Sequence, residues 1–148
     1  MAPRKKPKPP EAPGKGAVHS DPASPASAEQ KPLPEELAKK PYSDKSAAEW
    51  AYQRLILYIQ NFEEQLDETE EIGVYFAGEG SAVLRIEGIG YFDPDIVTFY
   101  GTDAEGLKTQ LIQHVSQLSV ALRALPREEQ RAEPRRIGFR LAADLQKR

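Results

Sequence analysis

The stretch GIGYFDPDIVTFYGTDAEGLKTQLIQHVSQL, residues 88–118, decides the fold because its two halves fit different elements. Asp93-Pro94-Asp95 predicts a turn, since proline presets the backbone angle that turns require. Residues 96–101 are rich in β-branched and aromatic side chains, which is typical of a strand. The glycine-containing loop at 102–106 predicts a hairpin, and a hairpin needs a partner strand directly after it. The stretch therefore predicts antiparallel strands.

Residues 107–125 fit two interpretations. As a helix, they place apolar residues every three or four positions, namely Leu107, Leu111, Val115, Leu118, Leu122 and Leu125. As strands, they supply the partner that residues 96–101 need, and Leu118, Val120 and Leu122 alternate with polar or small residues. A strand to about residue 113 followed by a helix from Ser116 is a third possibility. The sequence leaves these alternatives open.

The clearest helix is predicted over residues 46–67. Ser46 and Glu49 fit a capping box, in which the serine accepts a backbone N–H and the glutamate reaches back to the cap. A wide apolar face follows, as expected for a helix that packs on a sheet. Trp50 and Leu57 lie outside this face on one line of the helix. We expect them either to contact a second subunit or to be covered by the C-terminal tail.

Two further strands are predicted over residues 70–92. In the second of them Leu84 and Ile86 point to one side, and Gly88 and Gly90 follow on the same side, with Tyr91 opposite. Glycines on the inner face of a strand indicate a sharp bend, which a small barrel needs in order to close. At the other end of the chain, residues 126–148 predict a polar connection, a final edge strand at 137–141 and a short helix.

The N-terminal residues 1–44 differ from the rest in composition. Residues 1–41 hold most of the thirteen prolines and carry a net charge of +3, whereas residues 42–148 carry −6. With so few large apolar side chains, residues 1–44 are expected to be a disordered arm preceding a domain at 45–125. The arm contains a basic cluster, Arg4, Lys5, Lys6 and Lys8, that predicts either contact with RNA or an acidic partner, or only a solubilising tail.

Composition also excludes several classes of protein. The chain has no cysteine, which excludes disulfides and thiolate metal sites. Histidine at position 114 has no second histidine or placed carboxylate near it, so we predict no metal and no cofactor. No nucleophile, base and orienting group are recognisable, which argues against an enzyme. Because no apolar run is long enough to span a membrane, we expect a cytoplasmic protein with no membrane partner.

Two resemblances add to this interpretation. The strings LIQHVSQL, residues 111–118, and RRIGFRL, residues 135–141, resemble a family of bacterial proteins without an assigned function, over about residues 46–145. The order of elements, with Phe92-Asp93 in the turn and Gln113-His114 between two short strands, is similar to Sm-like proteins, Hfq in particular. That similarity implies a five-stranded barrel capped by the helix, rings closed by edge-strand pairing, and RNA binding near His114. Glutamine replaces the lysine of the Sm-like Lys-His pair.

We therefore expect an α+β fold: an N-terminal helix on a small twisted antiparallel sheet, closed as an Sm-like barrel or left open. The alternative is a helix–sheet–helix arrangement with residues 109–125 helical. The expected function is a non-enzymatic homo-oligomeric binding module, and the alternative is an Sm-like protein that binds single-stranded RNA. The polar and aromatic residues expected to contact a ligand are Tyr91, Phe92, Gln110, Gln113, His114 and Gln117.

Overall fold

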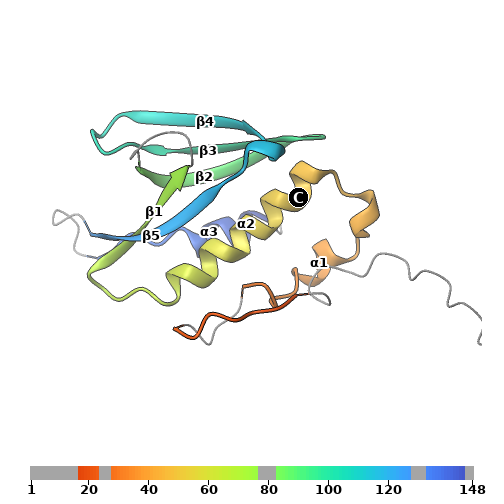
Figure 1. The fold of residues 1–148 in the computed structure, drawn as a ribbon, viewed down its shortest axis with the longest axis horizontal. Coiled ribbons are helices and arrows are strands. Elements are labelled where there is room, and N and C mark those ends of the chain that lie inside the picture. The colour runs from red at the N-terminus through yellow and green to blue at the C-terminus, as the bar shows by residue number, and fades with distance from the viewer. Residues whose placement is uncertain (1–16, 24–27, 77–82, 128–132, 146–148) are drawn as a thin grey trace, which may run out of the picture.

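A computed structural model describes residues 17–23, 28–76, 83–127 and 133–145. The helical elements are α1 (Glu35–Ala38), η1 (Tyr42–Asp44), α2 (Ala47–Glu63), η2 (Val115–Gln117) and α3 (Gly138–Leu145). The strands are β1 (Glu70–Phe76), β2 (Val83–Phe92), β3 (Ile96–Thr102), β4 (Lys108–His114) and β5 (Val120–Pro126). Helices α2 and α3 lie on one side of the sheet, and residues 28–45, which we call the N-terminal segment, run along α2 (Figure 1).

The five strands form one antiparallel sheet in the order β4-β3-β2-β1-β5. The predicted α+β fold is thereby confirmed, and the alternative with residues 109–125 helical is wrong. Residues 120–126 pair with β1 over all seven positions of β5, and only the short η2 separates them from β4. The sheet is open, because the described residues contain no pairing between β4 and β5. The expected closure into a barrel is therefore not found within one chain.

Helix α2 begins at its predicted cap. Ser46 Oγ accepts a hydrogen bond from the Glu49 backbone N–H at 3.0 Å, as a capping serine does. The Glu49 carboxylate does not reach back to the cap as predicted, because it is bound to Lys40 Nζ at 2.8 Å. Ser46 Oγ also donates to Asp93 at 2.5 Å, and the Ala48 N–H donates to the Pro94 carbonyl at 3.0 Å. These contacts fix the start of α2 against the turn between β2 and β3.

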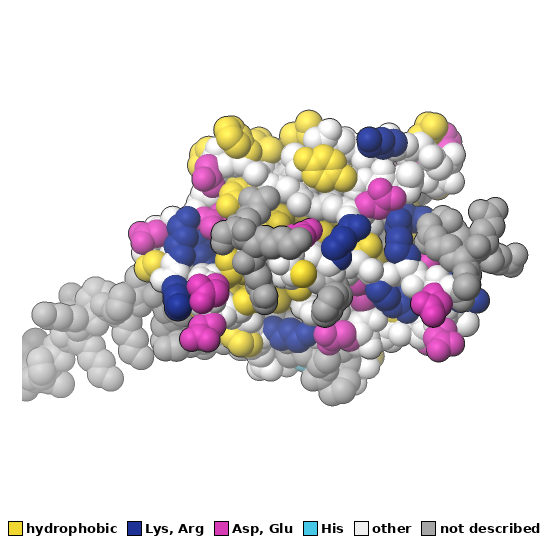
Figure 2. Space-filling model, turned by 180° about the vertical axis from the view of Figure 1, so that it is seen from behind, with side chains coloured by type: hydrophobic (Ala, Val, Ile, Leu, Met, Phe, Trp, Pro, Cys, Tyr) yellow, Lys and Arg dark blue, Asp and Glu magenta, His cyan; other side chains and the backbone are white. Residues whose placement is uncertain are grey.

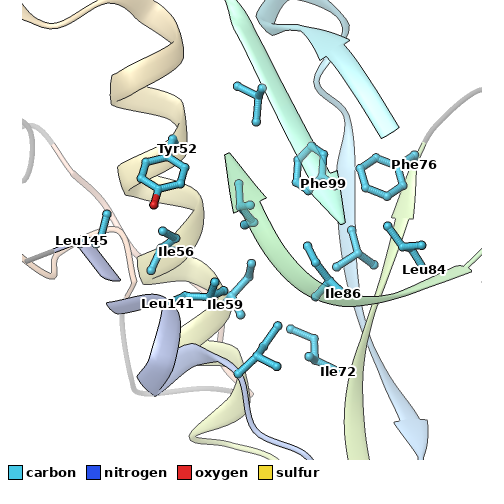
Figure 3. Close-up of a cluster of buried hydrophobic side chains, with 14 of the residues drawn as sticks. Tyr52, Ile56, Ile59, Ile72, Phe76, Leu84, Ile86, Phe99, Leu141 and Leu145 are labelled. Atoms are coloured by element: carbon cyan, nitrogen blue, oxygen red, sulfur yellow. The ribbon is translucent and has the colours of Figure 1, made fainter. Parts of the chain in front are cut away.

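The core lies between the sheet and the two helices α2 and α3 (Figure 3). Figure 3 shows Ile56 and Ile59 of α2 facing the sheet, with Leu141 and Leu145 of α3 beside them. On the sheet side, the rings of Phe76 and Phe99 meet at 4.8 Å between centroids in an edge-to-face contact. The core members without any exposed surface are Ala48, Ile56, Val74, Ile86 and Val97.

A bulge in β2 corrects the predicted orientation of its second half. The pairing of β2 with β3 shifts register between Ile86 and Gly88. One extra residue in a strand exchanges the side chains of the two faces beyond it. Ile89 is therefore buried, and Tyr91 points inward to Tyr52, with 5.0 Å between ring centroids. Gly88 and Gly90 lie on the outer face and not, as predicted, on the inner one.

The C-terminal residues form helix α3 where an edge strand was predicted at 137–141. Ile137, Leu141 and Leu145 are buried, and their spacing of four matches a helix. The Glu63 carboxylate accepts the backbone N–H of Ile137 at 3.0 Å and that of Gly138 at 2.5 Å. These N–H groups begin the helix and would otherwise lack acceptors. Glu63, which is distant in sequence, thus supplies the hydrogen-bond acceptors for the start of α3. No residue near position 137 indicates this contact.

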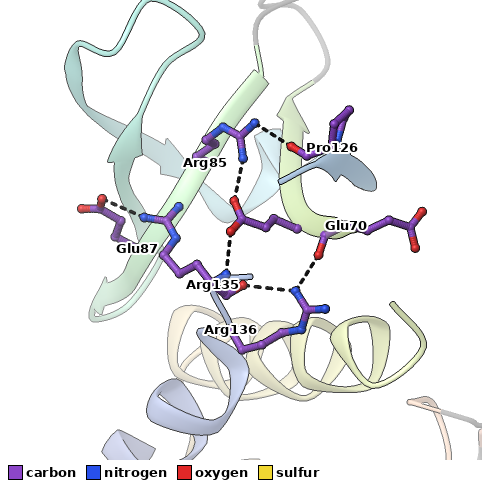
Figure 4. A network of polar contacts seen from close by, with 7 residues as sticks. Glu70, Arg85, Glu87, Pro126, Arg135 and Arg136 are labelled. Atoms are coloured by element: carbon purple, nitrogen blue, oxygen red, sulfur yellow. Dashed lines mark hydrogen bonds and ion pairs between the residues drawn. The ribbon is translucent and has the colours of Figure 1, made fainter. Parts of the chain in front are cut away.

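A second buried carboxylate, Glu71 on β1, holds the same segment (Figure 4). Glu71 accepts from Arg85 Nη1 at 2.9 Å and from the backbone N–H of Arg135 at 2.5 Å. Arg136 Nη1 donates to the carbonyl of Glu70 at 2.6 Å. The C-terminal segment, residues 133–145, is therefore joined to α2 and β1 through buried polar contacts as well as through its apolar side chains.

The N-terminal segment, residues 28–45, lies along α2. Arg54 donates to the carbonyls of Ala28 and Lys31 at 2.5 and 2.8 Å. The Tyr42 ring contacts Trp50, with 5.2 Å between centroids. Trp50 lies one turn before Arg54 on the same side of α2, and Leu57 lies one turn after it and is buried. The N-terminal segment lies on this side of α2, while the basic cluster at positions 4–8 is outside the described residues.

Candidate functional site

The candidate site is the outer face of β2, β3 and β4, opposite the helices. Strand pairing aligns three rows of residues across these strands. We define the outer face as the members of these rows, which are Phe92, Ile96 and His114, then Gly90, Thr98 and Ile112, then Gly88, Tyr100 and Gln110. Because side chains alternate along a strand, the buried residues Val97 and Phe99 place these rows on the other side.

The outer face exposes large apolar side chains. Phe92 is 74 % exposed, Ile112 61 % and Tyr100 42 %. Figure 2 shows hydrophobic side chains gathered along the upper part of the view from behind, where β3 and β4 lie. Leu107, in the loop that precedes β4, is exposed as well. Clustered exposed apolar side chains of this kind mark surfaces that contact a partner or ligand.

The two glycines of the outer face form a flat support for Tyr100. A Cβ atom at Gly88 would lie 3.7 Å from the Tyr100 ring, and one at Gly90 would lie 3.5 Å from it. A side chain at Gly90 would also meet Thr98 Oγ1 at 2.8 Å. The Tyr100 hydroxyl is 3.2 Å from the same Thr98 oxygen. The ring is thereby held across the sheet with part of its surface open to solvent, which is a geometry suited to stacking.

His114 occupies one end of the outer face in a fixed orientation. Its Nδ1 accepts the Ser116 backbone N–H at 3.1 Å, so the proton of the neutral ring is on Nε2. Nε2 lies 2.8 Å from the Asp95 carboxylate. His114 is also the residue before η2, and its own N–H donates to Gln117 Oε1 at 2.9 Å. The imidazole therefore ties the β2–β3 turn to the connection between β4 and β5.

The order of contacts Asp95–His114–Ser116 is that of a hydrolase triad, since Ser116 Oγ lies 2.8 Å from Nδ1. All three side chains are at the surface, with His114 45 % and Asp95 39 % exposed. A catalytic serine needs a site shielded from water and fixed donors for the oxyanion. The contact of His114 with Ser116 caps η2, and its contact with Asp95 fixes the turn between β2 and β3, so we assign the set a structural role.

The structure brings only part of the predicted site together. Phe92, Gln110 and His114 share the outer face, as the sequence interpretation requires. Tyr91 and Gln113 lie on the inner face, where Gln113 is buried, and Gln117 belongs to η2. Tyr100 and Ile112 were missed. Their exposure follows from strand alternation once Phe99 and Leu111 are taken as inward-facing, so this signal was present in the sequence.

Neither a metal-binding cluster nor a membrane-spanning helix is found in residues 17–23, 28–76, 83–127 and 133–145. This part of the chain contains no group of three or more His, Asp or Glu side chains placed to hold a metal ion. None of its helices has the length and apolar character needed to cross a membrane.

Comparison with known proteins gives one match. Neither a curated protein nor a solved structure gives a significant match to the chain. The sequence model of the family of unknown function DUF6173 matches residues 42–140, close to the range expected from the sequence, and the chain therefore belongs to that family.

Proposed function

We propose that the chain is a non-enzymatic, homo-oligomeric binding module that assembles by pairing β4 of one copy with β5 of the next. The observation that supports this proposal is the open sheet. Each edge strand is seven residues long, and neither has a second partner strand among the described residues. Unpaired backbone N–H and C=O groups along an edge strand favour pairing with another chain.

The edges carry few of the features that prevent such pairing. β4 contains no proline, its only lysine is Lys108 at the first position, and Ile112 is exposed beside the edge. β5 carries Arg123, whose guanidinium lies over the Tyr75 ring at 3.9 Å and so is drawn onto the face of the sheet. Pro126 stands at the last position of β5, where it leaves the preceding residues free to pair.

Pairing between unlike edges suits this sheet better than a twofold contact. A β4–β4 contact would leave β5 unpaired in both copies, whereas β4–β5 contacts use both edges of every copy. Such head-to-tail contacts close into a ring when the rotation between copies permits it. The similarity to Sm-like proteins implies the same mode of assembly.

The test is the mass of the full-length protein in solution, measured by light scattering after size exclusion. We expect an oligomer for the natural chain and a smaller species for Ile112→Lys, because lysine beside an edge opposes pairing. Tyr58→Lys is the matched control, since Tyr58 is also exposed but lies on α2. A monomeric natural chain at micromolar concentration, or an unchanged mass for Ile112→Lys, contradicts the proposal.

A second candidate, single-stranded RNA binding, is favoured by the flat exposed ring of Tyr100. Nucleotide bases stack on exposed aromatic rings, and Phe92 provides a second ring on the same face. Gln110 and His114 add hydrogen-bonding groups beside these rings. The face itself carries little positive charge, so the basic cluster Arg4, Lys5, Lys6 and Lys8 would supply the attraction to phosphate.

Fluorescence anisotropy with a labelled oligouridine tests this candidate at low and moderate salt. Loss of one stacked base costs about 1–3 kcal/mol, so Tyr100→Ala should weaken binding about 5-fold to 150-fold. His114→Ala should also weaken it, and deletion of residues 1–15 should reduce its dependence on salt. Tyr58→Ala serves as the control. If the natural chain does not bind the probe at low salt, or if these changes leave affinity unaltered, RNA binding by this face is wrong.

A further inference from the structure

A cavity of about 300 Å³ lies where the N-terminal segment meets α2, the end of β2 and the end of α3. None of its lining residues belongs to the two edge strands or to the outer face. Its lining combines apolar groups with a few charged and polar ones, and consists of Glu36, Leu37, Lys40, Glu49, Tyr52, Gln53, Tyr91 and Leu145. A concave site with apolar walls and a few convergent polar groups is typical of small-molecule binding.

The fixed charge of the cavity is the Glu49 carboxylate. Glu49 belongs to the first turn of α2, where its backbone N–H is held by Ser46 Oγ. Its side chain is only 11 % exposed, and the carboxylate is turned toward Lys40 and away from the helix cap. A carboxylate in this position has lost much of its contact with water and needs a cationic partner.

The present partner of Glu49 is replaceable. Lys40 lies between α1 and η1, its side chain is 50 % exposed, and its ammonium reaches the carboxylate at 2.8 Å. Glu49 raises the pKa of Lys40 through this hydrogen bond. A long, half-exposed lysine contributes little through such a pair and can turn into solvent. Lys40 therefore shows which kind of group the Glu49 carboxylate can bind, namely a primary ammonium on an aliphatic chain.

The remaining walls suit the body of an amine. The rings of Tyr52 and Tyr91 meet at 5.0 Å, tilted by 49°, and Leu37 and Leu145 complete an apolar lining. Aromatic rings beside a carboxylate favour cations over anions. The buried amide of Gln53 already accepts a second ammonium, that of Lys45, at 2.7 Å.

We propose that this cavity binds a small molecule with one primary ammonium and an apolar body, the ammonium replacing that of Lys40 on Glu49. At about 30 Å³ per water-sized group, the volume admits roughly ten non-hydrogen atoms. An arylalkylamine or a short aliphatic amine has this size. The inference does not depend on assembly through the sheet edges or on RNA binding.

Isothermal titration calorimetry with phenethylamine as the probe tests the site in the full-length chain. We expect saturable 1:1 binding, and tighter binding to Lys40→Met, which removes the internal competitor while keeping an aliphatic stem. Phenethyl alcohol has the same body without the charge. It should bind about tenfold more weakly or worse, because a hydrogen bond between charged groups contributes more than one between neutral groups.

Two variants locate the binding. Glu49→Gln should abolish the preference for phenethylamine over phenethyl alcohol. Glu64→Gln is the matched control, because Glu64 follows the same helix and is exposed and paired with Lys31 at 3.2 Å, but does not line this cavity. The proposal is overturned if phenethylamine fails to saturate both the natural chain and Lys40→Met. Equal binding of the alcohol and the amine to the natural chain overturns it too, and that comparison stands even if Glu49→Gln fails to fold.

Discussion

Two segments outside the strands pack along α2, and they do so in different ways. The N-terminal segment contributes backbone carbonyls to Arg54 and the Tyr42 ring to Trp50, which is a partly exposed contact. The C-terminal segment contributes Ile137, Leu141 and Leu145, all buried in the core. It also places its backbone N–H groups on the buried carboxylates of Glu63 and Glu71.

The N-terminal segment packs on the surface of the domain, whereas the C-terminal segment contributes side chains to its core. Removing the N-terminal segment would uncover one side of α2 and remove the partly buried Leu37, but it would remove none of the buried side chains that form the core cluster. Removing the C-terminal segment would expose the core and leave two buried carboxylates without their backbone donors. Burial of apolar area and satisfaction of buried polar groups, and not position in the chain, decide which terminus is essential.

Deletion of residues 133–148 tests this contrast with the largest expected effect. Burial of each large apolar side chain contributes about 1.5–3 kcal/mol, so loss of three approaches the whole stability of a typical domain. We expect the truncated chain to lose its cooperative unfolding transition in circular dichroism. Deletion of residues 1–23 is the control and should change the melting temperature little. A cooperative transition in the chain without residues 133–148 would show that α3 is dispensable.

Gly138→Ala should give the next largest effect. An added Cβ would lie 2.8 Å from Gln60 Cα and 2.6 Å from Glu63 Oε1, so α3 would have to move away from α2. Overpacking of this kind costs about 1–3 kcal/mol, measurable by urea denaturation. Ala143→Ser, on the exposed side of α3, is the matched control and should stay within about 0.5 kcal/mol. Equal stability of the two variants would contradict the close helix contact.

The ionisation of Glu63 should make attachment of the C-terminal segment depend on pH. Burial raises the pKa of Glu63 above its ordinary value of 4.5, although its backbone donors oppose the shift. The folded chain therefore holds this proton to a higher pH than the unfolded chain. The stability contributed by the protonated carboxyl is present below about 4.5 and is lost as pH rises through the folded pKa.

Denaturation of the natural chain and of Glu63→Gln across this range measures the effect. The natural chain should lose stability relative to the variant as pH rises above 4.5. A stability difference that is independent of pH, or one that changes in the opposite sense, would mean that Glu63 ionises freely in the folded chain.

Arg54→Ala probes the N-terminal segment and should have the smallest effect. The variant loses hydrogen bonds to the carbonyls of Ala28 and Lys31. Each contributes at the low end of the usual range of about 0.5–1.5 kcal/mol, because the segment can loosen and leave these carbonyls to water. Trp50 is the only tryptophan of the chain, so its emission reports on this surface. We expect a red shift and faster amide exchange in residues 28–45, with little change in the unfolding midpoint. A loss of stability as large as that of Gly138→Ala would erase the contrast between the two segments.

Local signals in the sequence predicted the elements that rest on local contacts. The Ser46 cap, the turn at Asp93-Pro94-Asp95 and the hairpin between β3 and β4 are all contained within a few residues. The first half of helix α3 was assigned to a strand, and only the residues after 141 to a short helix, because residues 137–141 fit both a strand and a helix period. The carboxylate that decides between them, Glu63, lies 74 residues away from Ile137.

The candidate site was predicted in part for the same reason. Phe92, Gln110 and His114 lie on one face, because β2, β3 and β4 are joined by short turns. Tyr91 was placed on the wrong face because the β2 bulge is not marked by any residue pattern beyond its glycines. The packing of the N-terminal segment along α2 also depends on Arg54, which lies outside the segment itself.

Because of the bulge in β2, the number of residues in that strand decides which of its side chains face the core. Before the bulge, even-numbered residues such as Leu84 and Ile86 point into the core, and after it the odd-numbered residues Ile89 and Tyr91 do so. Deletion of a single residue at the bulge would remove the register shift, and the side chains of Ile89 and Tyr91 would then point into solvent. Glycines would then face the core. A relative of this chain can vary in the 102–106 loop. If it loses one residue from β2, however, the side chains in the second half of that strand exchange the core face for the solvent face.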